Sequence, residues 1–384
     1  MKFLSKVIIV FLMIALALAT VSCSPSTGDS SSSDSKKEDP KPTPTPTLED
    51  YEIPLTLEFI ADGEITITNP WSTLKYSKND GELTAVQATG DPLTALITVA
   101  KDDKISFFAE ESENISSNMT IGCNSDCYIY GNVMSLVSFD AASGKWDSTA
   151  KTITSINCFR SLFYKNSHIK NHKDRSIVLP ATTLKASCYE GMFYDCSSLT
   201  SAPALPATSL AEGCYCGMFY CCTSLTSAPA LPATSLANSC YDSMFYKCTS
   251  LSSAPVLPAT SLANSCYRDM FHGCTSLSSA PVLPATSLTG FCYRGMFSGC
   301  TSLTSAPVLP ATTLASYCYS GMFDGCINLN YIKCLATNIS KSACTESWVQ
   351  GVAASGTFVQ ADGMTGWTTG DDGIPAGWTV EDAQ

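Results

Sequence analysis

The sequence predicts an α+β fold: a solenoid of repeated short strands and short helices, preceded by a small antiparallel β-domain. The main observation is an internal repeat, because Leu-Pro-Ala-Thr recurs every 26 residues, without a gap, from Leu179, Leu205, Leu231, Leu257, Leu283 and Leu309. A second is a set of fixed apolar residues in each copy, spaced as on one helical face. A third is the strand-like alternation of residues 51–145, whose texture differs from that of the repeat.

Residues 1–22 have the features of an export signal. Lys2 and Lys6 supply positive charge before an apolar run, residues 7–19, whose 13 residues are too few for a membrane span; such a span needs about 20. Residues 23–50 are rich in Ser, Pro and Thr and have almost no apolar side chains. We therefore predict a disordered tether that holds a folded body away from a membrane surface.

Two interpretations of the cleavage site are open. An ordinary signal peptide would be cut at Ala19 or Ser22, whereas the stretch Thr20-Val21-Ser22-Cys23 resembles the signal of bacterial lipoproteins. That resemblance implies a lipid on the thiol of Cys23, cleavage before Cys23 and attachment to a membrane. Ser24 does not resemble an inner-membrane retention signal, which favours the outer membrane and the cell surface.

Residues 51–145 alternate apolar and polar side chains over short runs, PLTLEFI, EITITN, TALITV and DKISFFAE among them. Turn signals such as Asn79-Asp80-Gly81 separate the runs. This pattern predicts a small antiparallel β-domain similar to a sandwich, in which Cys123 and Cys127 could pair or pack. The segment CYIYGNVMSLVSF resembles one that joins such a domain to a repeat array, and we expect it to cover the array's first edge.

Residues 146–338 hold six good copies between two degraded ones, as the exposed ends of a stacked array require. In the copy CYDSMFYKCTSLSSAPVLPATSLANS, the fixed positions are Cys240, Tyr241, Met244, Phe245 and Cys248. The spacing i, i+4, i+8 with i+1, i+5 predicts a short helix with one apolar face. The prolines that follow prevent a long helix and predict a short extended piece. A strand-like and a helical piece in each copy are typical of the leucine-rich-repeat class of solenoid.

The tandem motif also resembles the BspA-like leucine-rich repeat of bacterial surface proteins. The resemblance covers residues 155–340 and lies in the ending aromatic-x-x-Cys, as in Phe219-x-x-Cys222, Phe245-x-x-Cys248 and Phe271-x-x-Cys274. It implies a cell-surface adhesin or scaffold that binds host or neighbouring-cell proteins. The 26-residue copy is longer than the unit common in that family, so we expect a bulge or a longer turn near the prolines.

The 20 cysteines admit three roles: metal ligands, disulfide halves and core packing. Metal binding is disfavoured, because the array has C-x7-C spacing and the one His pair at ligand spacing, His168 and His172, lies in a predicted solvated loop. If residues 240–248 are helical, the two cysteines are about 12 Å apart, beyond the reach of a disulfide. We predict a buried ladder of thiols. Bonds between copies, and a local bond between Cys216 and Cys221, remain open.

Residues 339–384 predict a C-terminal cap, because the last exposed edge of a stacked array must be covered. Trp348, Trp367 and Trp378 all fall in this segment and none falls in the copies. The alternative for these tryptophans is a site that binds a sugar or a peptide.

The sequence favours a binding function over catalysis. The net charge of −12 disfavours a nucleic-acid partner, and we find no phosphate loop, HExxH or Gly-x-Ser-x-Gly motif. We therefore expect no catalytic residues, no metal, no cofactor and no enzymatic activity, but a lipid-anchored protein that mediates protein binding or adhesion.

The alternative is a glycan-binding lipoprotein that uses the β-domain or the C-terminal tryptophans. A hydrolase in residues 51–145 is a third class. The variable positions on the predicted outer helical face are interpreted as tolerant surface.

Overall fold

The computed structural model describes residues 46–110 and 119–384, so the signal peptide, Cys23 and most of the predicted tether lie outside the described residues. The short helix α1 (Leu48–Glu52) is fixed by a capping box between Thr47 and Asp50. Asp50 is buried, and its carboxylate accepts a hydrogen bond from the backbone N–H of Ser176 at 3.3 Å. Residues 47–50, assigned to the disordered tether from sequence, therefore belong to the folded body.

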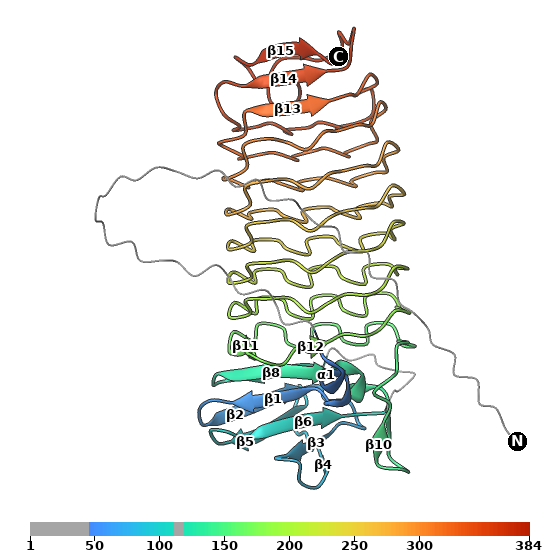
Figure 1. Cartoon of the computed structure of the whole chain (residues 1–384), viewed down its shortest axis with the longest axis vertical. Helices are drawn as coiled ribbons and strands as arrows, with labels where there is room; N and C mark the ends of the chain where they lie inside the picture. The colour runs from blue at the N-terminus through green and yellow to red at the C-terminus, as the bar shows by residue number, and fades with distance from the viewer. Residues whose placement is uncertain (1–45, 111–118) are drawn as a thin grey trace, which may run out of the picture. The chain divides into compact units, whose positions relative to one another are not determined.

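Two sheets pack together ahead of the repeat (Figure 1). The first has the order β11-β8-β1-β6-β3-β4, with β12 also paired to β8, and the second has the order β5-β2-β7. The bounds in the first sheet are β1 Thr56–Phe59, β3 Lys75–Lys78, β4 Thr84–Ala85, β6 Lys104–Phe108, β8 Cys127–Asn132, β11 Ile169–Asn171 and β12 Ile177–Val178. Those in the second are β2 Gly63–Thr68, β5 Thr94–Val99 and β7 Thr120–Cys123.

Alternate residues of these strands form the core between the sheets. Leu57 of β1 lies opposite Ile105 of β6 and Ile129 of β8, and in the second sheet Ile65 lies opposite Ile97. The 3₁₀ helix η1 (Val133–Leu136) follows β8, and the hairpin of β9 (Phe139–Asp140) and β10 (Lys145–Trp146) leads toward the repeat.

Strand β8 joins the two parts of the folded body. It pairs antiparallel with β1 on one side and parallel with β11 and β12 of the first copies on the other. The backbone N–H groups of the first copy's edge thus meet an ordered strand and are not left open to solvent.

From residue 152 to residue 360 the chain forms a pile of similar coils, which we call the coil stack (Figure 1). Alternate N–H groups of each turn segment donate to the next copy, as from Tyr241 N to Cys266 O at 3.1 Å and from Phe245 N to Met270 O at 2.9 Å. The intervening N–H groups close turns within a copy, as from Met244 N to Tyr241 O at 3.3 Å. Equivalent residues of successive copies therefore lie one above another.

The predicted α+β leucine-rich-repeat solenoid, with a strand and a helix in every copy, is wrong. In the described part of the chain only α1 and η1 are helical, and both precede the copies. Every fourth residue from just before the expected helix onward has a positive φ instead: Ser239 at 50°, Ser243 at 55° and Lys247 at 54°. Each set of four residues is therefore a separate tight turn, because a left-handed residue interrupts a right-handed helix.

The extended segment of the inner copies is not a regular strand either. It makes isolated bridges only, such as Ser235 with Ser261, because the prolines on either side of Val256 have no N–H to donate. Where the prolines are lost, regular strands appear: β13 (Tyr331–Cys334), β14 (Thr357–Gln360) and β15 (Thr379–Asp382) form a parallel sheet.

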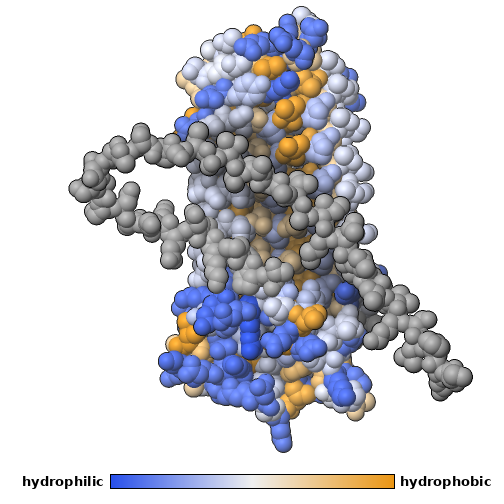
Figure 2. All heavy atoms as spheres, in the orientation of Figure 1, coloured by the Kyte–Doolittle hydropathy of each residue, from blue (hydrophilic) through white to orange (hydrophobic). Residues whose placement is uncertain are grey.

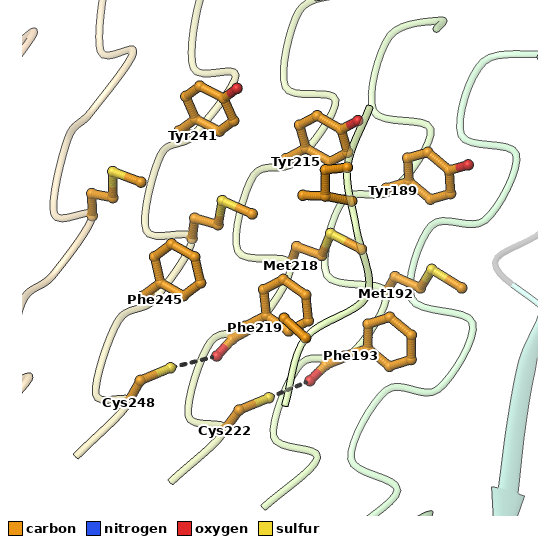
Figure 3. Packing of buried hydrophobic residues seen from close by; sticks show 14 of the residues in the cluster. Tyr189, Met192, Phe193, Tyr215, Met218, Phe219, Cys222, Tyr241, Phe245 and Cys248 are labelled. Atoms are coloured by element: carbon orange, nitrogen blue, oxygen red, sulfur yellow. Dashed lines mark hydrogen bonds between the residues drawn. The ribbon is translucent and has the colours of Figure 1, made fainter. Parts of the chain in front are cut away.

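The interior of the coil stack is a set of ladders built from the fixed residues (Figure 3). The ring of Phe219 stacks between those of Phe193 and Phe245, with centroids 5.7 and 5.8 Å away. The thiol of Cys222 donates to the carbonyl oxygen of Phe193 at 3.0 Å, and that of Cys248 donates to Phe219 at 3.1 Å (Figure 3).

The predicted ladder of buried thiols is confirmed. Every cysteine within the described residues is free, and both cysteine columns of the array are buried. Cys216 and Cys221 are also free, so the local bond that their spacing allows is not formed. Burial raises the pKa of the Cys240 and Cys274 thiols to about 12, so both stay protonated in neutral solution.

Candidate functional site

The outer surface of the coil stack repeats in the same register as its core. Hydrogen-bonded neighbouring chains lie about 4.8 Å apart, so one position of the repeat produces a column of side chains. Two such columns stand out among the described residues because they place apolar or aromatic groups at the surface.

The first column, which we call the apolar stripe, is the residue that directly follows the first proline of each copy: Ala204, Ala230, Val256, Val282 and Val308. Val256 and Val282 are 79% and 78% exposed, and Val308 is 50% exposed. Hydrophobic residues form a column along the coil stack in Figure 2. The Leu that follows each stripe residue is buried, so the backbone alternates as in a strand and must direct this position outward.

A groove runs beside the apolar stripe between two neighbouring copies. Its volume is about 320 Å³, and its lining contains only Ala, Pro, Leu and Val: Ala228, Pro229, Ala230, Leu231, Pro232, Pro255, Val256 and Pro258. Because the prolines fix φ, the backbone that forms this groove already has its conformation in the absence of a partner.

The second column, which we call the aromatic ladder, consists of stacked rings at the surface: Tyr164, Tyr194, Tyr220, Tyr246 and His272. Successive ring centroids are 4.8, 4.4, 4.3 and 4.4 Å apart. Tyr164 is 40% exposed and the others are partly exposed. The ammonium groups of Lys165 and Lys247 lie 5.2 and 5.5 Å from the centroids of Tyr164 and Tyr246.

The aromatic ladder occupies positions interpreted from sequence as tolerant surface. Its signal was present, because Tyr220 and Tyr246 lie one repeat apart and Tyr194 precedes them at the same interval. The helical interpretation does not predict the aromatic ladder, because it gives no reason for the side chains of one variable position to stack from copy to copy.

The two histidines at ligand spacing, for which metal binding is disfavoured from sequence, do not converge on one point. The ring nitrogen Nδ1 of His168 lies 3.0 Å from Asp126, whereas the ring of His172 packs edge-on against Tyr128 and Tyr130. Within residues 46–110 and 119–384, no group of three or more His, Cys, Asp or Glu side chains is placed to hold a metal ion.

The C-terminal tryptophans pack over the last coils. Trp348 is buried, stacks 6.2 Å from Tyr319 and 5.5 Å from Trp367, and donates its indole N–H to Gly373 O at 2.8 Å. Trp378 is also buried, and its indole N–H donates to Ala353 O at 2.7 Å. These two rings therefore extend the core, and only Trp367 is partly exposed.

Comparison of the chain with models of protein families, with curated proteins and with solved structures finds no match. None of the helices in the described ranges is long and apolar enough to cross a membrane. The folded body is thus a stack of turn-built coils that displays an apolar stripe and an aromatic ladder.

Proposed function

We propose that this chain is a non-catalytic, lipid-anchored surface protein that binds extracellular proteins through its coil stack, as an adhesin or scaffold. The observation that carries the proposal is the apolar stripe, which exposes valines in register. Apolar surface of this kind on a soluble body is typical of a protein–protein contact. The BspA-like motif resemblance supports the same function.

Burial of the apolar stripe would stabilise a complex at a low entropic cost. Removing apolar surface from water contributes roughly 25 cal/mol per Å², and valine has few rotamers to lose. The prolines and the buried leucine beside each stripe residue already fix the backbone. Residues 179–334 carry only five basic and six acidic side chains, so little charge must be desolvated.

The partner chemistry that fits the stripe is a flat apolar surface with the same repeat distance. A second copy of this chain has that surface, because its valines recur at the same spacing and its groove is a complementary depression. Two stripes in antiparallel contact would form a self-complementary interface. We therefore take association between copies on neighbouring cells as the first case of adhesion to test.

The membrane anchor in this proposal is a lipid on Cys23, which lies outside the described residues. The apolar part of residues 1–22 and the Ser-, Pro- and Thr-rich stretch after Cys23 support export and display on the outer membrane. Glycan binding through the C-terminal tryptophans is not favoured, because Trp348 and Trp378 are buried and their N–H groups are already bonded.

Cells that display the full chain should clump, and Val256→Asp with Val282→Asp should reduce clumping by about tenfold or more. Each carboxylate would have to be desolvated at the contact, and every 1.4 kcal/mol is a factor of about ten in affinity. The measurement is the rate at which the turbidity of a standing cell suspension falls as clumped cells settle, with the amount of surface protein matched between strains. Cys23→Ala should release the protein into the medium and also abolish clumping.

The control is Thr260→Asp with Thr286→Asp, which adds the same charge to the same two copies at exposed positions off the stripe. This control should clump like the unaltered chain. Clumping that survives the stripe substitutions, or that the control loses equally, would rule out the stripe as the contact surface.

A further inference from the structure

The aromatic ladder ends at a hollow in the surface of the coil stack. We call it the His272 hollow, and its lining includes Arg268, Asp269, His272, Arg294, Ser298 and Asp324. Its volume is about 430 Å³, within the range of ligand pockets. It lies on the turn face and does not include the residues of the apolar stripe.

The hollow exists because two columns carry smaller side chains, or none, at this point than in the two preceding copies. Ser298 and Asp324 continue the column of the aromatic ladder after His272, so no ring follows. Gly295 and Gly321 continue the column that holds Ser243 and Asp269 in the preceding copies. These smaller residues in two adjacent columns leave space that the side chains of the two preceding copies fill.

The last ring of the ladder presents a free face to this space. His272 stacks on Tyr246 with centroids 4.4 Å apart and planes 5° from parallel, which covers one face of the imidazole. The next position in the column is Ser298, which has no ring to cover the other face. Desolvation lowers the pKa of His272, so the ring is neutral at neutral pH and behaves as an aromatic surface.

Polar groups of both signs surround that face. Arg268 is held by Asp242 and Asp269, with Nε to carboxylate distances of 3.3 and 3.4 Å. Arg294 makes no ion pair among the described residues, and neither does Asp324, so both can bond a ligand. The hydroxyl-bearing residues Ser298 and Ser320 lie at the floor.

We propose that the His272 hollow binds a neutral pyranose ring of a saccharide, stacked on His272 in the place of the missing rung. The C–H face of a pyranose complements the negative face of an aromatic ring. Its hydroxyl groups can both donate to Asp324 and accept from Arg294. A free aromatic ligand without hydroxyl groups would leave Asp324 and Arg294 without hydrogen-bond partners, which is costly.

The probes are the methyl glycosides of glucose, galactose, mannose and N-acetylglucosamine, each tested by saturation-transfer NMR with the full chain. We expect transfer to at least one of them, reduced by about tenfold in affinity in His272→Ala. Ser298→Tyr should abolish it, since a tyrosine there completes the aromatic ladder and fills the space. Its backbone position is equivalent to that of Tyr220 and Tyr246, so the variant should fold.

Tyr194→Ala is the matched control, because it removes a rung of the same ladder far from the hollow and should leave binding unchanged. The proposal is overturned if none of the four glycosides binds, or if binding persists in both His272→Ala and Ser298→Tyr. It is also overturned if N-acetyl-tyrosine amide binds in their place, which would assign the hollow to a protein side chain. Cell clumping through the apolar stripe is independent of all these results.

Discussion

Phe245→Ala should lower the free energy of unfolding by about 3–5 kcal/mol, the cost of truncating a fully buried aromatic side chain. Phe245 has no exposed surface, and its ring stacks 5.8 Å from Phe219 and 5.7 Å from Phe271. Its carbonyl oxygen also accepts the thiol of Cys274 at 3.1 Å, so a shift of its backbone would disturb the next copy. The measurement is denaturant unfolding followed by circular dichroism.

Ser252→Ala in the same copy is the control. Ser252 is exposed, and a substitution of this kind usually changes stability by less than about 0.5 kcal/mol. A loss of under about 1 kcal/mol for Phe245→Ala would mean that the stacked phenylalanines do not hold neighbouring coils together.

Gly131→Ala should destabilise the junction between the two packed sheets and the coil stack by about 2–5 kcal/mol, from left-handed strain and overpacking together. Gly131 lies in β8 with a φ of 87°, and a Cβ there would overlap the carbonyl oxygen of Pro54. Its N–H donates to Ser176 O at 2.9 Å, so movement to relieve the overlap would break the pairing with the first copies.

The matched control for the junction is Gly122→Ala in strand β7 of the second sheet. A Cβ at Gly122 meets its nearest atom at 3.8 Å, which is ordinary contact, and its φ is not positive. This variant should be as stable as the unaltered chain or slightly more stable. Equal losses in the two variants would contradict the tight contact assigned to Gly131.

The repeat length, the fixed inward residues and the free buried thiols could all be predicted from the sequence, because repetition makes them visible in one chain. The local conformation could not. Nine residues from Cys240 to Cys248 place the same side chains inward at a period of 4.0 or of 3.6, since the two periods differ by only about 80° over eight steps. The deciding signal was glycine at every fourth position, as at Gly321 and Gly325, which have φ of 62° and 73°.

The candidate surfaces were harder to predict than the core. The repetition of the proline segment is visible in the sequence, but the outward direction of Val256 depends on backbone alternation that a strand-and-helix scheme does not specify. The His272 hollow depends on the absence of a ring at Ser298 and of a side chain at Gly295. The sequence does not reveal such a gap until equivalent positions of successive copies are aligned in space.

Gly321→Ala tests most directly the claim that each copy is built from turns and not from a helix. Gly321 has a φ of 62°, and a Cβ there would meet nothing within 4 Å, so only the backbone conformation is probed. The turn structure predicts a loss of about 1–2 kcal/mol in the free energy of unfolding, the cost of a left-handed non-glycine residue. Gly290→Ala, at a residue without a positive φ and with its nearest atom 3.6 Å from the added Cβ, should show no such loss. A gain of about 1 kcal/mol for Gly321→Ala, as glycine-to-alanine gives inside a helix, would contradict the account.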